Sequence, residues 1–192
     1  MTPAHEGSQR SVRTLTSYLL LSLDGVAEEP GDWMFEADGD VFANLARVIG
    51  TQSDVLLGRA TYDYWAGYWP GSDVQPFADF INGTTKHVVT STPLAAAWSG
   101  SQVVAGPLFE HVTELKRGDG GDIGLHGSIR LTQALLAAGL VDRLELVVVP
   151  TIAGSGRRLF DGGELRRLSL ARAQRSPSGC AFLTYDVPFS QP

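Results

Sequence analysis

A glycine and an arginine stand where a short apolar run meets an aromatic one, in LLGRATYDYWAGYWP at residues 56–70. A helix that begins directly after Gly58 offers unpaired backbone N–H groups and the positive end of its dipole, and glycine lets an anion approach the backbone. Arg59 adds a side chain that can hold a phosphate through two hydrogen bonds. The pattern fits an anion site, and it fits equally well a tight turn followed by a solvated arginine.

Two further segments place polar groups directly after apolar runs. In HVVTST, the hydroxyls of Thr90 and Ser91 could bind a phosphate or simply cap a turn. In IGLHGSIRLTQALL, Gly127 and Ser128 stand at the start of a predicted helix, which is the arrangement expected of a pyrophosphate site. His126 could line a pocket or be a satisfied core histidine. The usual G-x-G-x-x-G dinucleotide pattern is absent.

A carboxylate ends the first apolar run, in SLDGVAEEPGDWMF. Asp24 could orient a polar heterocycle or relay a proton, but Asp-Gly is also an ordinary turn signal. The loop that follows carries Trp33. Aromatic residues between 62 and 69 cover nearly the whole circumference of their predicted helix, so some of them must face outward.

Composition argues against several other classes of protein. The net charge is −6 and the 15 lysines and arginines are scattered, which does not suit a nucleic-acid partner. The sequence has no Cys/His cluster with metal-ligand spacing, so no metal site is predicted. Residues 1–11 are small and polar, unlike a signal peptide, and no apolar run approaches the roughly 20 residues of a membrane span. We therefore expect a cytoplasmic protein without a membrane partner.

Strand and helix patterns alternate through most of the chain. We expect a single α/β domain at residues 12–190, after a flexible arm at 1–11, with a largely parallel sheet covered on both faces. A hairpin of 168–174 and 181–187 should add antiparallel strands at one edge. In such sheets, ligands bind outside the carboxyl ends of the strands. The expected strands are 14–23, 54–57, 86–90, 102–105, 122–125 and 143–150, and the expected helices are 38–49, 60–69, 74–81, 107–116 and 128–138.

Taken together and in this order, these segments resemble the dihydrofolate reductase-like superfamily. The resemblance is to the branch with the reductase domain of the bifunctional riboflavin-biosynthesis deaminase-reductase and its small stand-alone relatives. It covers about residues 13–187 and is carried above all by GRATY and LVDRLELVVVPTIAGSGRRLF. It implies a three-layer fold, NADPH as cofactor and a homodimer, for which residues 168–187 would be the natural surface.

The resemblance also implies roles for individual residues. Gly58, Arg59 and Thr61 would meet the cofactor phosphates, and Thr90 and Ser91 the side of the adenosine 2′-phosphate. The pyrophosphate would lie on Gly127, Ser128 and Ile129. Asp24 would be the catalytic polar group, and the substrate would contact Trp33, Tyr62 and Trp65.

The leading hypothesis is an NADPH-dependent reductase of a small heterocyclic substrate, pteridine-like or pyrimidine-like. Dihydrofolate itself is not expected, because the helix at 38–49 should turn Val41, Phe42, Leu45 and Ala46 inward rather than a carboxylate. One alternative is a non-catalytic protein that binds a nucleotide or another small molecule. Another is the riboflavin-pathway reductase acting without a deaminase domain. NADH also stays open as the cofactor, since only Arg59 and Lys86 could favour the extra phosphate.

Overall fold

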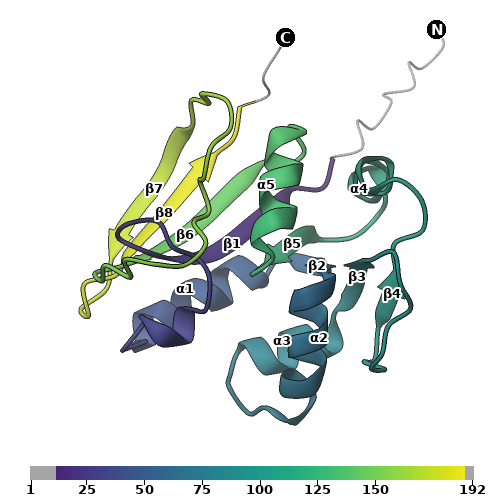
Figure 1. The fold of residues 1–192 in the computed structure, drawn as a ribbon, viewed down its shortest axis with the longest axis horizontal. Coiled ribbons are helices and arrows are strands. Elements are labelled where there is room, and N and C mark those ends of the chain that lie inside the picture. The colour runs from purple at the N-terminus through teal and green to yellow at the C-terminus, as the bar shows by residue number, and fades with distance from the viewer. Residues whose placement is uncertain (1–11, 189–192) are drawn as a thin grey trace, which may run out of the picture.

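The structure, a computed structural model, describes residues 12–188. The predicted N-terminal arm at 1–11 lies outside the described residues. Within them, the strands form a single eight-stranded sheet in the order β4-β3-β2-β5-β1-β6-β8-β7 (Figure 1). The strands are β1 (Leu15–Ser22), β2 (Gln52–Gly58), β3 (Thr85–Val89), β4 (Ser101–Val103), β5 (Asp122–His126), β6 (Arg143–Val149), β7 (Ser169–Arg175) and β8 (Ala181–Asp186).

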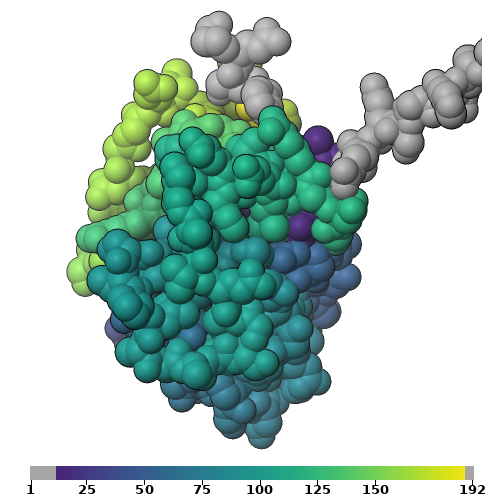
Figure 2. Space-filling model, turned by 90° about the vertical axis from the view of Figure 1, so that its right-hand side faces the viewer, coloured from purple at the N-terminus to yellow at the C-terminus, as the bar shows by residue number. Residues whose placement is uncertain are grey.

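The sheet is mixed, as the sequence predicts. The six strands from β4 to β6 in the sheet order run parallel, whereas β8 runs antiparallel to both β6 and β7. The terminal hairpin therefore forms one end of the sheet, and β7 is its outer strand. The opposite end is formed by β3, β4 and the helix between β4 and β5, which face the viewer in Figure 2.

Helices cover both faces, which confirms the three-layer α/β architecture. They are α1 (Gly39–Ile49), α2 (Arg59–Tyr68), α3 (Phe77–Gly83), α4 (Leu108–Arg117) and α5 (Ile129–Ala137), with short 3-10 helices at Pro30–Asp32 and Trp69–Gly71. Leu19 and Leu125 pack with α4 and α5 on one face of the sheet. Residues on the other face pack against α1, α2 and α3, so an apolar layer lies on each side of the strands.

The inward face of α1 differs from the prediction. Asn44 is buried on this helix, whereas Phe42 and Ala46 are exposed. The apolar residues of this segment are compatible with two helix faces, and tertiary contacts select between them. The amide oxygen of Asn44 accepts hydrogen bonds from Arg47 and Arg172, both at 3.1 Å, which makes the burial of this polar side chain possible.

Candidate functional site

Two of the predicted turns meet at the carboxyl ends of the adjacent strands β2 and β5. The backbone N–H of Gly58 donates a hydrogen bond to Ser128 Oγ at 2.9 Å. The Ser128 hydroxyl in turn donates to Thr61 Oγ1, also at 2.9 Å. Parallel pairing of β2 with β5 brings the starts of α2 and α5 to the same edge of the sheet. Three of the predicted cofactor residues are therefore in direct contact.

The start of α5 keeps its backbone N–H groups free of side-chain caps. Ser128 occupies the predicted N-cap position, but its hydroxyl makes no capping hydrogen bond because it is directed to α2. Unpaired N–H groups in the first turn of a helix are a ready site for an anion. The side chain of Ile129 is buried in the core, so only its backbone can face a ligand here.

Gly127 occupies a position that favours glycine, and it lies next to Trp65. Its φ of +68° is in the left-handed region, where a side chain adds strain. A Cβ at this position would lie 3.3 Å from Cζ2 of Trp65 and 3.9 Å from Cγ2 of Thr61. Of the aromatic residues predicted to contact the substrate, Trp65 is thus the one that lies beside the start of α5.

Arg59 holds the loop that follows β3. Its Nη1 donates to the carbonyl oxygen of Pro93 at 2.9 Å and to Thr90 Oγ1 at 3.3 Å, and it also contacts both oxygens of Thr92. Its Nε donates to the carboxylate of Asp63 at 2.6 Å. The structure therefore places Arg59 beside Thr90, as the sequence predicts, but already engaged with protein atoms.

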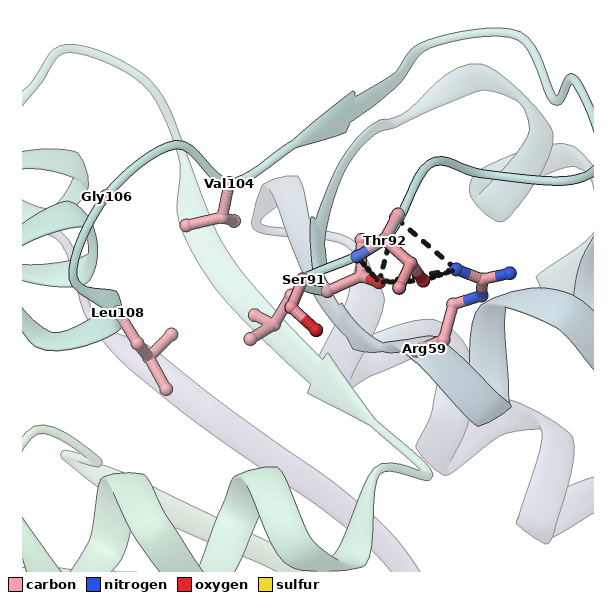
Figure 3. A pocket seen from close by; sticks show the side chains of 8 residues that line it. Arg59, Ser91, Thr92, Val104, Gly106 and Leu108 are labelled. Carbon is pink, nitrogen blue, oxygen red and sulfur yellow. Dashed lines mark hydrogen bonds between the residues drawn. The ribbon is translucent and has the colours of Figure 1, made fainter.

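A cavity of about 520 Å³ opens next to this loop (Figure 3). This volume falls within the range of small-molecule sites, which is about 300–1,000 Å³. One part of its wall is apolar and the other carries hydroxyl groups. The lining residues are Arg59, Val89, Thr90, Ser91, Thr92, Val104, Gly106 and Leu108.

Lys86 does not take part in this site, and the expectation that it could favour an extra phosphate is wrong. It lies near the start of β3, whereas Thr90 follows the end of that strand. The side chain is fully buried, and its Nζ donates to the carbonyl oxygens of Ile81 at 2.7 Å and Thr84 at 2.6 Å. Burial lowers the pKa of Lys86 to about 8.

Asp24 makes no hydrogen bond to Gly58, Thr61 or Ser128 and instead anchors the loop after β6. Its carboxylate accepts hydrogen bonds from the Ser22 hydroxyl at 2.7 Å and from the backbone N–H groups of Ala153 at 2.9 Å and Gly154 at 3.0 Å. These hydrogen bonds lower the pKa of Asp24 to about 2, and the one from Ser22 has the largest effect. A group so acidic is ionised at neutral pH, where it accepts hydrogen bonds and cannot donate a proton.

Two of the predicted substrate residues are core residues in this structure. The Trp33 indole is buried against the α1 side of the sheet, and its N–H donates to the carbonyl oxygen of Glu28 at 2.8 Å. Tyr62 is fully buried, and its hydroxyl donates to the carbonyl oxygen of Ala96 at 2.7 Å. Because their polar atoms are satisfied by the backbone, neither side chain presents a free group to a ligand.

His126 is likewise a core histidine and not a pocket-lining one. It is buried, its Nε2 lies 2.8 Å from Gln52 Oε1, and its ring packs against Tyr18, Phe77 and Phe80. Burial lowers the pKa of His126 to about 3, so the ring is neutral at physiological pH.

The sequence profile of the RibD C-terminal domain matches residues 13–182. The chain belongs to the RibD C-terminal domain family. Two relatives from Bacillus subtilis strain 168 are YyaP, 26% identical over 175 residues, and YwjB, 28% identical over 151 residues. These alignments cover 87% of this chain and 91% of YyaP, and 77% of this chain and 83% of YwjB.

Three solved structures share this fold. A riboflavin biosynthesis protein from Shewanella sp. PV-4 superposes with a TM-score of 0.74 at 16% identity, covering 91% of this chain and 99% of its own. A pyrimidine reductase-like protein from Corynebacterium diphtheriae gives 0.67 at 19% identity, with 92% of each chain covered. Dihydrofolate reductase from Enterococcus faecalis, complexed with NADP(H), gives 0.63 at 16% identity, covering 91% and 96%.

This RibD C-terminal domain also has a row of polar residues, buried except for the partly exposed Arg172, that sequence reasoning missed. Tyr18, Glu145, Thr184 and Arg172 are successive cross-strand neighbours on β1, β6, β8 and β7. Glu145 is 3% exposed, and its carboxylate accepts from Arg47 of α1 at 2.7 Å and from Thr184 at 2.8 Å. The available signal was a glutamate within the apolar strand RLELVVV. The row ties α1 to the sheet.

Neither a metal site nor a membrane span is found in this domain. Among residues 12–188, no group of three or more His, Cys, Asp and Glu side chains is arranged to hold a metal ion. None of the helices in that range combines the length and the apolar character needed to cross a membrane.

Proposed function

We propose that this protein is a reductase that uses NADPH to reduce a small heterocyclic substrate. The observation that carries the proposal is the contact between Gly58 and Ser128, which sets the starts of α2 and α5 side by side. Membership of the RibD C-terminal domain family and a fold shared with an NADP(H)-bound dihydrofolate reductase support it. The cofactor, when bound, would supply the hydride, and the protein would orient and polarise the substrate.

The residues present fit such a cofactor. The uncapped first turn of α5 and the backbone of Gly127 would hold the pyrophosphate, where the bare glycine allows close approach. The cavity beside Arg59 would take the adenosine, with Val89, Val104 and Leu108 against its apolar face. The hydroxyls of Thr90 and Ser91 would lie at the 2′-phosphate.

For the substrate, we infer a pteridine-like or pyrimidine-like heterocycle other than dihydrofolate. The buried residues of α1 are Val41, Asn44, Val48 and Ile49, so this helix turns no carboxylate inward. A cationic pterin would therefore lack a partner on α1. Trp65, beside Gly127, is the aromatic side chain best placed to contact the reacting ring.

A calorimetric titration with NADPH, NADH and flavin mononucleotide tests the cofactor assignment. We expect micromolar binding of NADPH and no binding of the flavin. Oxidation of bound NADPH, followed by its absorbance, would then be screened against pteridines, pyrimidines and the ribosylaminopyrimidine of riboflavin synthesis. Absence of any nicotinamide binding would refute the proposal.

A second candidate is a protein that binds a nucleotide without turnover. The ionised state of Asp24 favours it, because that carboxylate is not a proton donor at neutral pH. NADPH binding without oxidation by any compound in the panel would support this candidate over the first.

We also propose that the protein forms a homodimer through β7 and β8. Most residues of β7 are exposed, and its outer edge pairs with no other strand of the described residues. Exposed edge strands promote association with another chain unless they are covered.

A further inference from the structure

The side chain of Arg59 has few donors left for a ligand. Nη1 donates hydrogen bonds to the loop after β3, at Thr90, Thr92 and Pro93. Figure 3 shows the guanidinium group turned toward Thr92. Nε donates a hydrogen bond to the carboxylate of Asp63. The Nη2 group has no hydrogen bond to any of the described residues. Arg59 can therefore offer an anion its charge and the donors of Nη2, while Nη1 and Nε are engaged with protein atoms.

Asp63 sits one helical turn after Arg59 and neutralises that charge. The two residues form an i, i+4 ion pair along α2, with Nε and Oδ2 at 2.6 Å. Their side chains are 30% and 44% exposed, so both groups remain accessible to solvent and to a ligand. Residues at this spacing are neighbours on the helix surface, so the backbone of α2 keeps the two side chains within reach of each other.

Among the described residues that line the cavity, Arg59 is the only one with a charged side chain. The hydroxyls of Thr90, Ser91 and Thr92 are neutral, and Lys86 is bonded to carbonyl groups near the other end of β3. With Asp63 included, the net charge beside the cavity is close to zero. A 2′-phosphate brings about two negative charges, which an adenosine without that phosphate lacks.

We propose that Asp63 determines how strongly this site prefers a nicotinamide cofactor that carries a 2′-phosphate over one that does not. Its carboxylate offsets the charge of Arg59, the only cationic residue among the described residues that line the cavity, so discrimination between NADPH and NADH is weak in the natural protein. The inference rests on the proposed function, because it assigns the cavity to the adenosine end of the cofactor. Asp63 is a specificity-determining residue that acts through Arg59.

The test is the ratio of the dissociation constants for NADPH and NADH, measured by calorimetry for the natural protein and for Asp63→Asn. The substitution should tighten NADPH binding and leave NADH binding nearly unchanged, so that the ratio shifts about three- to tenfold toward NADPH. Asp79→Asn is the matched control. Asp79 is exposed on α3 and accepts a hydrogen bond from Gln75, so its loss changes the net charge equally at another place.

A purely structural effect of Asp63→Asn would weaken both cofactors together and leave the ratio unchanged, and that result would overturn the inference while the proposed function stood. An equal shift in Asp79→Asn would also overturn it. In an Arg59→Ala background, Asp63→Asn should change the ratio of the dissociation constants much less, because Asp63 then has no arginine charge to offset. If neither cofactor binds the natural protein, the proposed function and this inference both fail.

Discussion

The hydroxyl of Ser128, at the start of α5, accepts a hydrogen bond from the backbone N–H of Gly58, at the end of β2. This contact joins two helix starts that are 70 residues apart in the chain. Because Ser128 then donates to Thr61, its hydroxyl satisfies a backbone donor and a side-chain acceptor at once. One side chain therefore connects the starts of α2 and α5 at the proposed pyrophosphate site.

Replacement of Ser128 with alanine should therefore weaken both the fold and the site. Ser128 is 6% exposed, so the N–H of Gly58 would lose its partner in a largely buried place. We expect the free energy of unfolding to fall by about 1–3 kcal/mol. NADPH should bind more weakly as well. Urea denaturation and calorimetric titration of the same variant measure the two effects.

Ser17→Ala is the matched control for that variant. Ser17 is fully buried on β1, and its hydroxyl is 3.0 Å from Thr132 Oγ1 on the same helix, α5. Its loss should lower stability by a similar amount but leave NADPH binding unchanged. An equal loss of binding in Ser17→Ala would show that the effect of Ser128→Ala is only a general loosening of α5.

Gly127 and Gly139 form a second matched pair, with φ angles of +68° and +67°. Alanine at either position should cost about 1–2 kcal/mol of stability, because both glycines occupy the left-handed region. A methyl group at 127 would also lie 3.3 Å from Trp65, whereas nothing lies within 4 Å at 139. We expect calorimetry to show weaker NADPH binding for Gly127→Ala alone. Equal binding by the two variants would remove Gly127 from the site.

The sequence predicts most of the elements of this fold but little of their side-chain contacts. Apolar periodicity places β1 and α1 correctly because it reports local burial. It does not report that Asn44 turns inward, since the arginines that satisfy its amide include Arg172, 128 residues away. In the same way, Trp33 and Tyr62 were predicted to face a ligand, but backbone carbonyls bind their polar atoms. The partners of Asn44 and Tyr62 are distant in the chain and leave no local signal, whereas the Trp33 contact lies within one irregular loop, whose geometry apolar periodicity does not report.

A buried ion pair lies near the amino end of β2, away from the carboxyl ends where the proposed site lies. It should contribute to stability and not to cofactor binding. Asp54 on β2 accepts from Arg13, whose side chain is 5% exposed, and from His87 Nε2 at 2.9 Å. Asp54→Asn would leave the guanidinium group without its counter-ion, and we expect a loss of about 2–4 kcal/mol in urea denaturation. The exposed Asp79→Asn should change stability by less than about 0.5 kcal/mol. Similar small effects in both would mean that water replaces the carboxylate at Arg13.

The proposed dimer predicts an effect of one exposed leucine on β7. Leu170 is 56% exposed on the outer strand of the sheet. Light scattering should give twice the 20.6 kDa of one chain for the natural protein, and a monomer for Leu170→Lys. Leu165→Lys, at a fully exposed residue before β7, should remain a dimer. A monomeric natural protein would contradict the proposal.

Asp24 predicts a specific dependence of stability on pH. Hydrogen bonds from Ser22, Ala153 and Gly154 lower its pKa from the ordinary 3.8 to about 2. A carboxyl whose pKa is lower in the folded state stabilises the fold above its unfolded pKa, and this contribution is lost as the pH falls through the folded one. The free energy of unfolding should therefore be higher for the natural protein than for Asp24→Asn at neutral pH, and the difference should shrink between about pH 4 and pH 2.

Urea denaturation of both proteins at several pH values, with NADPH oxidation measured alongside, separates the two roles considered for Asp24. An anchoring carboxylate gives a difference in stability that closes in acid, and Asp24→Asn keeps measurable turnover because the group carries no transferable proton at neutral pH. If the difference in stability instead stays constant down to about pH 2 and turnover is abolished without loss of NADPH binding, the hydrogen bonds to Ala153 and Gly154 do not hold the carboxylate ionised. Asp24 would then be a proton relay, as its position at the end of the first strand allows.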